Sequence, residues 1–265
     1  MTLIYDVNNW IRVKLSTDGD QLTIMNFWNE VLYNSQQGET QIFVSDGFNS
    51  RKKRKDIYPE YKAKRKPADI SIYDGINFFK NLLRHAPKNV FYIELPEVEA
   101  DDVIAHLVYN HRSYFLKTPI DIISTDKDLT QLMTVEGVRT LGKAPVDPKF
   151  VHLYKTLVGD SSDNIPGVDG LGPSTWHKLP EDLLVQLDNL FKYNQDLTVG
   201  LCTELELFLK KKQLENFYEA YYNGTLQMFY KIVGFFPIPV DFSMFKQGDG
   251  DLNYVNQKLN DLFIL

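Results

Sequence analysis

Short apolar runs alternate with helix-like apolar patterns along the first half of the chain. Runs typical of strands occur at about residues 3–5, 42–45, 90–93 and 120–125, and residues 135–141 could add one more. Strands that alternate with helices are typical of a mostly parallel sheet with helices on both faces, so the pattern predicts an α/β core. Between and after the runs, apolar residues recur at helical spacing, at Leu22, Met25, Phe27, Trp28, Val31, Leu32, Ile72, Ile76, Phe79, Leu83, Val103, Ile104, Leu107 and Val108.

The pattern changes at about residue 150. A Gly/Pro-rich stretch is followed by helical apolar patterns at residues 183–191 and 205–222. We therefore expect an α/β core over residues 1–149, a helical subdomain over residues 150–236 and a tail over residues 237–265 that packs back on the core.

Acidic residues follow the apolar runs repeatedly. The carboxyl ends of parallel strands line one crevice, so carboxylates at these positions would converge there. Such a group repels itself unless hard cations neutralise it, and Mg²⁺ and Mn²⁺ prefer oxygen ligands. The sequence thus predicts a metal-dependent active site built from Asp6, Asp46, Glu99, Asp101, Asp102, Asp126, Asp128, Asp160 and Asp163.

Composition and charge refine this prediction. A chain of 265 residues with 43% apolar content can form one large domain or two smaller ones with an ample core. The net charge of −6 does not by itself indicate a nucleic-acid-binding protein, but basic residues cluster at residues 51–55 and 62–66. This segregation suits a polyanion held near bound metals, although a solvated charged loop is the simpler interpretation of one basic run.

Three further features concern the compartment. The single Cys202 excludes an internal disulfide and fits a reducing environment. The first residues lack the regions of a signal peptide, and no apolar stretch approaches membrane-spanning length. We expect a soluble, cytoplasmic protein that does not bind membranes.

Five motifs occur in an order that resembles a known family, the flap endonucleases and 5′→3′ exonucleases of phages and bacteria. Asp6 closes the first strand and Asp46 the second, and the resemblance extends from residue 5 to about residue 179. Residues 61–65 match the family's Tyr-Lys-x-x-Arg motif, and residues 99–102 match its Glu-Ala-Asp-Asp motif. Residues 126–128 match Asp-x-Asp, and residues 159–167 match Gly-Asp-x-x-Asp-Asn-x-x-Gly. Residues 170–173 resemble the hairpin of the family's helix–three-turn–helix element. The resemblance implies a PIN-like nuclease core with a helical subdomain that contains this element.

The resemblance also implies a site for two divalent ions, Mg²⁺ with Mn²⁺ as a substitute, acting on one scissile phosphodiester. The first ion would lie among Asp6, Asp46, Glu99, Asp101 and Asp102. The second would lie among Asp126, Asp128, Asp160 and Asp163, with Asp101 between the two ions. Each of these acids taken singly is equally well explained as a turn or helix cap, but caps do not explain their common order.

Nucleic-acid contacts follow from the same resemblance. Lys62 and Arg65 would contact the scissile phosphate, and Tyr61 would stack on a terminal base. Residues from about 50 to 68 match an arch through which a single-stranded 5′ end passes, and repulsion among its basic residues predicts poor order without DNA. The arch residues expected to bind DNA are Arg51, Lys52, Lys53, Arg54, Lys55, Lys64 and Lys66.

The glycine-rich hairpin would bind backbone phosphates, with Gly170, Gly172, Ser174 and Lys178 as contacts. In the family, carbonyls of this hairpin also hold a K⁺ ion, which implies Val168 and Gly170 here. Ser174 and Thr175 stand where the family often has a basic residue. An ordinary helix–helix turn is the alternative interpretation of the hairpin.

The resemblance implies a stand-alone, phage-encoded, monomeric 5′ nuclease that removes RNA primers and 5′ flaps in replication. Its substrates would be DNA with 5′ flaps, gaps or ends and RNA–DNA hybrids, in a bacterial cell or an infected host cell, with replication proteins as partners. Two alternatives remain open. A PIN-like single-strand ribonuclease generally lacks both the hairpin and Tyr-Lys-x-x-Arg, and a catalytically silent DNA-structure-binding protein would not need the complete set of acids.

Overall fold

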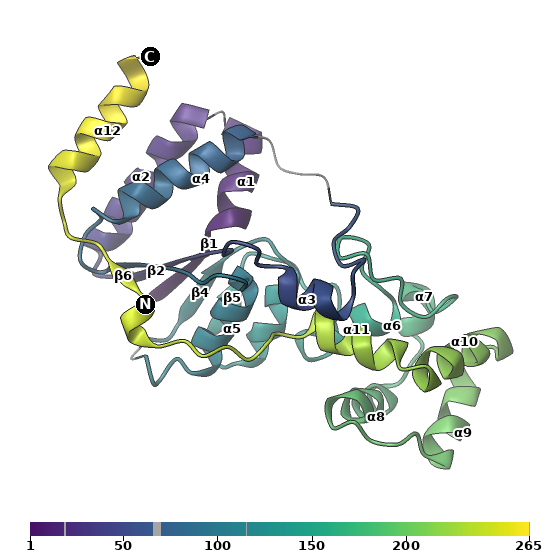
Figure 1. Ribbon diagram of the computed structural model, residues 1–265. Coiled ribbons are helices and arrows are strands. Elements are labelled where there is room, and N and C mark those ends of the chain that lie inside the picture. Colours follow the sequence, from purple (N-terminus) through teal and green to yellow (C-terminus); the bar gives the residue numbers. More distant parts are fainter. Residues whose placement is uncertain (19, 66–69, 115, 265) are drawn as a thin grey trace. The chain divides into compact units, whose positions relative to one another are not determined.

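The computed structural model of the protein describes residues 1–18, 20–65, 70–114 and 116–264. The chain forms two compact units (Figure 1). Unit 1 contains Met1–Ser50, Pro67–Lys143 and Pro237–Leu265, and unit 2 contains Arg51–Lys66 and Ala144–Phe236. This division differs from the expected grouping, because the basic segment that follows Ser50 belongs with the helical unit and not with the α/β core.

Unit 1 is built on a six-stranded sheet with the order β5-β4-β1-β2-β3-β6. All neighbouring strands are parallel except β6, which pairs antiparallel with β3. The prediction of a mostly parallel α/β sheet is therefore confirmed. The strands are β1 (Thr2–Asp6), β2 (Thr40–Ser45), β3 (Val90–Glu94), β4 (Ile120–Ile123), β5 (Val138–Thr140) and β6 (Lys246–Gln247).

Helices cover both faces of this sheet (Figure 1). One face carries α1 (Val7–Asp18), α2 (Asp20–Gln36) and α4 (Ile70–Leu83), and α12 (Leu252–Ile264) packs on α2. The opposite face carries α5 (Ala100–Tyr109), which contacts β1 and β2, and the 3₁₀ helix η1 (Asp128–Thr134) packs against α5. Side chains alternate between the two faces along a strand, so the buried strands β1, β2 and β3 contribute side chains to both faces of the sheet.

Aromatic rings fill the core under α1, α2 and α4. The rings of Tyr5 and Phe43 stack with centroids 4.4 Å apart, and Trp10 stacks on Phe27. Phe79 from α4 packs against Phe27 and Phe43 with centroids 5.7 Å away in each case. Rings of this size bury a large apolar area and hold the first two strands and their helices in one rigid layer, which places the strand ends.

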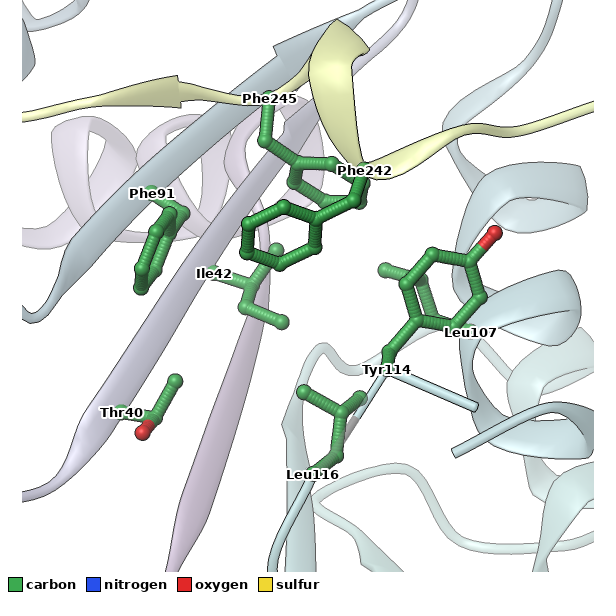
Figure 2. A pocket seen from close by; sticks show the side chains of 8 residues that line it. All are labelled: Thr40, Ile42, Phe91, Leu107, Tyr114, Leu116, Phe242 and Phe245. Atoms are coloured by element: carbon green, nitrogen blue, oxygen red, sulfur yellow. The ribbon is translucent and has the colours of Figure 1, made fainter. Parts of the chain in front are cut away.

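An apolar pocket lies on the α5 face of the sheet (Figure 2). Its volume is about 150 Å³, and the C-terminal segment around η3 (Phe242–Met244) closes it. The hydroxyl of Tyr114 donates to the carbonyl oxygen of Val240 at 2.6 Å, which holds this segment in place. None of its lining residues carries a charge, and they are Thr40, Ile42, Phe91, Leu107, Tyr114, Leu116, Phe242 and Phe245.

Unit 2 is helical. Its helices are η2 (Pro148–Phe150), α3 (Lys52–Ile57), α6 (Val151–Leu157), α7 (Pro173–Trp176), α8 (Glu181–Lys192), α9 (Val199–Phe208), α10 (Lys211–Tyr222) and α11 (Thr225–Val233). They enclose a core in which Leu157, Leu187 and Phe217 are fully buried. Among the described residues, no helix of either unit is both long enough and apolar enough to cross a bilayer.

Arg54 attaches the basic segment of unit 2 to the helices of that unit, while poor order of this segment without DNA stays a prediction. The buried guanidinium donates from Nε to the carbonyl oxygen of Ile232 at 2.9 Å and from Nη2 to that of Gly234 at 3.0 Å. It also lies over the ring of Phe236, 4.4 Å from the centroid. Cations are favoured at helix C-termini, where carbonyls lack partners, so Arg54 attaches α3 to the end of α11.

Candidate functional site

Three acidic residues meet at the carboxyl edge of the unit 1 sheet. Asp6 ends β1, and Asp46 follows β2, its parallel neighbour. On the other side of β1, Ser124 after β4 donates its hydroxyl to Asp6 Oδ2 at 3.0 Å and accepts the backbone N–H of Asp126 at 3.1 Å. The convergence predicted from the ends of the apolar runs is therefore present within this unit for Asp6, Asp46 and Asp126.

Asp6 is the most strongly perturbed of these carboxyls. Burial raises its pKa to about 7, and the charges of Asp46 and Asp126 add to this effect. The backbone N–H of Asn9 donates to Asp6 Oδ1 at 3.1 Å, so Asp6 also caps the start of α1. The cap explains one oxygen only, and the repulsion from two neighbouring carboxylates is the expected property of a cation site that carries excess negative charge.

Asp46 connects this group to the start of α5. Its Oδ1 accepts the backbone N–H of Ala100 at 2.9 Å. Glu99 is the N-cap residue of α5, Asp101 and Asp102 lie in the first turn, and the side chains of Glu99 and Asp102 are buried. A helix N-terminus stabilises negative charge, so the fold accommodates these carboxylates at one end of one helix.

The Asp-x-Asp motif forms a compact turn. Asp126 Oδ1 accepts the backbone N–H of Asp128 at 2.9 Å, and Asp128 begins η1. The seven candidate acids before residue 149 therefore all lie at or just after the ends of strands of unit 1, or at the starts of the helices that follow.

Asp160 and Asp163 lie in a tight loop of unit 2, where each pairs with a lysine. The backbones of Asp160 and Ile165 exchange two hydrogen bonds of 2.8 Å, which closes the loop. Lys155 Nζ lies 2.6 Å from Asp160 Oδ2, and Lys62 Nζ lies 3.7 Å from Asp163 Oδ1. Although burial opposes it, the ion pair with Lys155 lowers the pKa of Asp160 below its usual value.

Lys155 is a site residue that sequence reasoning missed. Its side chain is buried on α6. Lysine is rarely buried unless it is paired, and here Asp160 is the partner. The only signal in the sequence is a lysine one turn and one residue before Asp160, inside an otherwise apolar helix pattern. Spacing of this kind is too common to identify an ion pair without the fold.

The Tyr-Lys-x-x-Arg residues fall into two groups in unit 2. The Tyr61 ring is 2% exposed and lies 4.8 Å from Lys62 Nζ, and the Lys62 backbone N–H donates to the carbonyl oxygen of Asp163 at 3.1 Å. Burial of Tyr61 favours a role in supporting Lys62 over stacking on a base. Arg65 and Lys64 are exposed.

The remaining basic residues of the segment are distributed unevenly. Lys52, Lys53 and Lys55 are exposed, Arg51 is half-buried and Arg54 is buried. The contacts of Arg54 favour a structural role over a phosphate contact, whereas a DNA contact stays a prediction for the exposed residues. Lys66 lies outside the described residues.

The glycine hairpin of residues 167–172 precedes α7 and its Pro173. Gly167 has φ +70°, and a Cβ there would approach backbone atoms of Val158 and Leu157 to within 2.7 Å, so only glycine fits. The carbonyl oxygen of Gly170 accepts a hydrogen bond from Gln213 Nε2 at 2.6 Å. The K⁺ site at the Val168 and Gly170 carbonyls stays a prediction, as do the contacts through Gly172 and the exposed Ser174 and Lys178.

The protein combines a mostly parallel sheet, with carboxylates clustered at its carboxyl edge, and a helical unit with a glycine hairpin. This combination is typical of metal-dependent α/β nucleases. The family described as 5'-3' exonuclease, N-terminal resolvase-like domain, matches residues 14–154. That is more than half of the chain, and the protein belongs to this family. The family membership predicted from the order of the motifs is therefore confirmed.

Individual relatives agree with this assignment. The chain is 35% identical over 139 residues to a 5'-3' exonuclease of Aquifex aeolicus, which covers 48% of this chain and 47% of the relative. It is also 35% identical over 147 residues to flap endonuclease Xni of Shewanella piezotolerans, and this match covers 50% of this chain and 54% of the relative. The chain thus spans about half the length of these two relatives.

A solved structure gives the same fold over more of the chain. The flap endonuclease of bacteriophage T5, determined as a pseudo-enzyme–product complex with DNA and metal ions, aligns with a TM-score of 0.61 over 88% of this chain and 89% of its own. The sequence identity is 19%, so this likeness concerns the fold, and it confirms the predicted PIN-like architecture with a helical subdomain.

Proposed function

We propose that the protein is a structure-selective 5′ nuclease that hydrolyses phosphodiester bonds with the help of divalent metal ions. The observation that carries this proposal is the crowding of Asp6, Asp46 and Asp126, where Ser124 bonds to both Asp6 and the backbone of Asp126. Burial first, and then the charges of Asp46 and Asp126, raise the pKa of the Asp6 carboxyl to about 7. A protein gains nothing in stability from such repulsion, so a cation-binding function is the physical reason to keep it.

The donor set fits hard cations, because every candidate ligand is a carboxylate oxygen. In the proposed arrangement Asp6, Asp46, Glu99, Asp101 and Asp102 would hold one ion, and Asp126, Asp128, Asp160 and Asp163 would hold a second. When bound, such ions supply Lewis-acid stabilisation and a nucleophile from water at neutral pH. We assign Mg²⁺ as the ion, with Mn²⁺ as a substitute, and a K⁺ ion to the hairpin carbonyls of Val168 and Gly170.

The chain's own residues orient the substrate. Lys62 Nζ lies near both the Asp163 carboxylate and the Tyr61 ring, so its ammonium group has a defined position. We assign Lys62 and Arg65 to the scissile phosphate, where positive charge stabilises the developing negative charge. Lys155 keeps Asp160 ionised and oriented, and is thus a positioning residue.

The substrate assignment rests on similarity. Relatives named 5'-3' exonuclease and flap endonuclease Xni, and the T5 flap endonuclease bound to DNA, support DNA with 5′ flaps, gaps or ends as the substrate class. RNA–DNA hybrids, a monomeric state, an intracellular location and a role beside replication proteins are further parts of the proposal.

The experiment that tests the proposal uses labelled 5′-flap, gapped, blunt, RNA-primed and single-stranded RNA substrates, with and without Mg²⁺. We expect cleavage near the 5′ branch point only when divalent metal is present. Cleavage of single-stranded RNA alone would favour a ribonuclease. Tight binding of flaps with no cleavage in Mg²⁺ or Mn²⁺ would indicate a binding protein.

A further inference from the structure

The side chain of Gln213 joins the start of α10 to the glycine hairpin. Its Oε1 accepts the backbone N–H of Lys210 at 2.8 Å. Its Nε2 donates to the carbonyl oxygen of Gly170 at 2.6 Å and to Thr175 Oγ1 at 3.0 Å. One amide therefore accepts from the N-cap residue of α10 and donates both to the hairpin and to α7.

A second contact fixes the same helix turn. Asn216, three residues after Gln213, donates from Nδ2 to the carbonyl oxygen of Asp169 at 2.9 Å. Two amide side chains spaced by nearly one helical turn hold a surface in both position and orientation. The first turn of α10 thus has a defined place beside residues 169–175.

Three consecutive lysines occupy this turn. Lys210 is the N-cap residue of α10, Lys211 and Lys212 follow it, all three are exposed, and no acid lies in the first turn. Positive charge at a helix N-terminus opposes the helix dipole, so these lysines weaken the helix they begin. Lys212 Nζ lies 3.6 Å from Glu215 Oε2, but this exposed ion pair offsets little of the unfavourable interaction with the helix dipole.

Lysines are unfavourable at a helix N-terminus, and here they occur beside the hairpin that we propose binds DNA. Residues that weaken the fold at such a place are candidates for a function. Residues 167–175, which contain the hairpin and the start of α7, carry one acid, Asp169, and no basic side chain of their own. Through the contacts of Gln213, which span 43 and 38 residues of the chain, the fold brings three positive charges beside these residues.

We propose that Lys210, Lys211 and Lys212, which we call the lysine patch, form with the hairpin one surface that binds the phosphates of duplex DNA. Lysine binds phosphate as a point charge, so the patch contributes affinity without reading sequence. Gln213 is the positioning residue that attaches the patch to the hairpin. This inference rests on the proposed function only in taking duplex DNA as the ligand, and it concerns residues beyond the region that resembles the family.

The test measures binding of wild-type protein and variants to a fluorescent blunt duplex, without divalent metal, over a series of salt concentrations. The double variant Lys210→Ala/Lys211→Ala should bind about tenfold more weakly at low salt. The slope of log Kobs against log salt should fall in magnitude by about 2, since each lost phosphate contact removes about 0.9. The control Lys192→Ala/Lys231→Ala removes equal charge from the last turns of α8 and α11 and should leave affinity and slope near wild type.

Gln213→Ala separates position from charge. It keeps all three lysines, so affinity should fall while the slope changes less than in the double lysine variant. Circular dichroism and thermal unfolding establish that each variant is folded, and loss of the lysines should not lower the unfolding temperature.

Two outcomes would overturn the inference. If the control pair of substitutions weakens duplex binding equally, only the net charge of the protein matters. If the salt slope of the double lysine variant is unchanged, these lysines do not contact phosphates. Neither outcome bears on catalysis. Because binding is read without metal, a protein that binds through the patch but never cleaves would refute the nuclease proposal alone.

Discussion

Lys155 Nζ lies 2.6 Å from Asp160 Oδ2, and both side chains are at most 12% exposed. A buried ion pair is costly to break, because removing one partner leaves the other charge without compensation. This pair occurs where the loop of residues 159–167 closes on α6, so it holds a candidate metal ligand against the core of unit 2.

Lys155→Met should therefore reduce the free energy of unfolding by about 3–5 kcal/mol, measured by urea denaturation. Lys149→Met, which breaks an exposed pair with Glu181, is the control and should change stability little. Adding Asp160→Asn to Lys155→Met should restore part of the loss. Equal stability of Lys155→Met and wild type would show that the carboxylate does not depend on this lysine.

Arg54 should matter for folding more than for DNA binding. Arg54→Ala leaves the carbonyls of Ile232 and Gly234 without their donor, so we expect a loss of roughly 2–3 kcal/mol in chemical denaturation. Lys53→Ala, an exposed neighbour on the same helix, should stay within about 0.5 kcal/mol of wild type. A reversed order of the two variants would contradict the structural role of Arg54.

Asp126→Asn keeps the oxygen that accepts the backbone N–H of Asp128 but removes the charge. Turnover of a 5′-flap substrate should fall by roughly two orders of magnitude or more, while DNA affinity is kept or increases because repulsion of phosphate is reduced. Asp121→Asn on β4, whose carboxylate pairs with Arg139, is the matched control and should cleave normally. Normal turnover by Asp126→Asn would remove it from the metal site.

Lys62→Ala should lower turnover roughly 100-fold or more and weaken duplex binding far less, if its ammonium group acts mainly on the transition state. Lys64→Ala, two residues away and exposed, should show the opposite balance, with weaker binding and near-normal single-turnover cleavage. Parallel losses of binding and turnover in Lys62→Ala would make this residue an ordinary phosphate contact.

His152 makes the stability of the protein depend on pH. Burial lowers the pKa of its imidazole. The ring stacks on that of Tyr230, with centroids 3.8 Å apart, and its Nε2 donates to the carbonyl oxygen of Tyr230. As the pH falls, His152 takes up a proton in the unfolded chain before it does so in the folded protein. The contribution of neutral His152 to the free energy of unfolding is therefore present above about pH 6.5 and is lost as the pH falls toward the lower pKa of the folded state. His152→Gln cannot titrate and should lose less stability between pH 7 and pH 5 in urea denaturation. Parallel pH profiles for the two proteins would rule this out.

The acidic edge of the sheet was predictable because it depends on short-range order. An apolar run that ends in an aspartate specifies a buried strand with a carboxylate at its end, and parallel pairing then brings Asp6, Asp46 and Asp126 to one edge. The attachment of the basic segment through Arg54 was not predictable, because its carbonyl partners lie far along the chain.

By itself, the sequence determined the alternation of strands and helices, the acids at the strand ends and the order of motifs that identifies the family. Tertiary structure alone decided the pairing of Lys155 with Asp160, the burial of Tyr61 and Arg54, and the attachment of α10 to the hairpin through Gln213. Arg54 and Ile232 are 178 residues apart, and Gln213 and Gly170 are 43 apart. Periodicity reports only on neighbours within a turn or a strand, whereas these contacts depend on how whole helices pack, which no local pattern encodes.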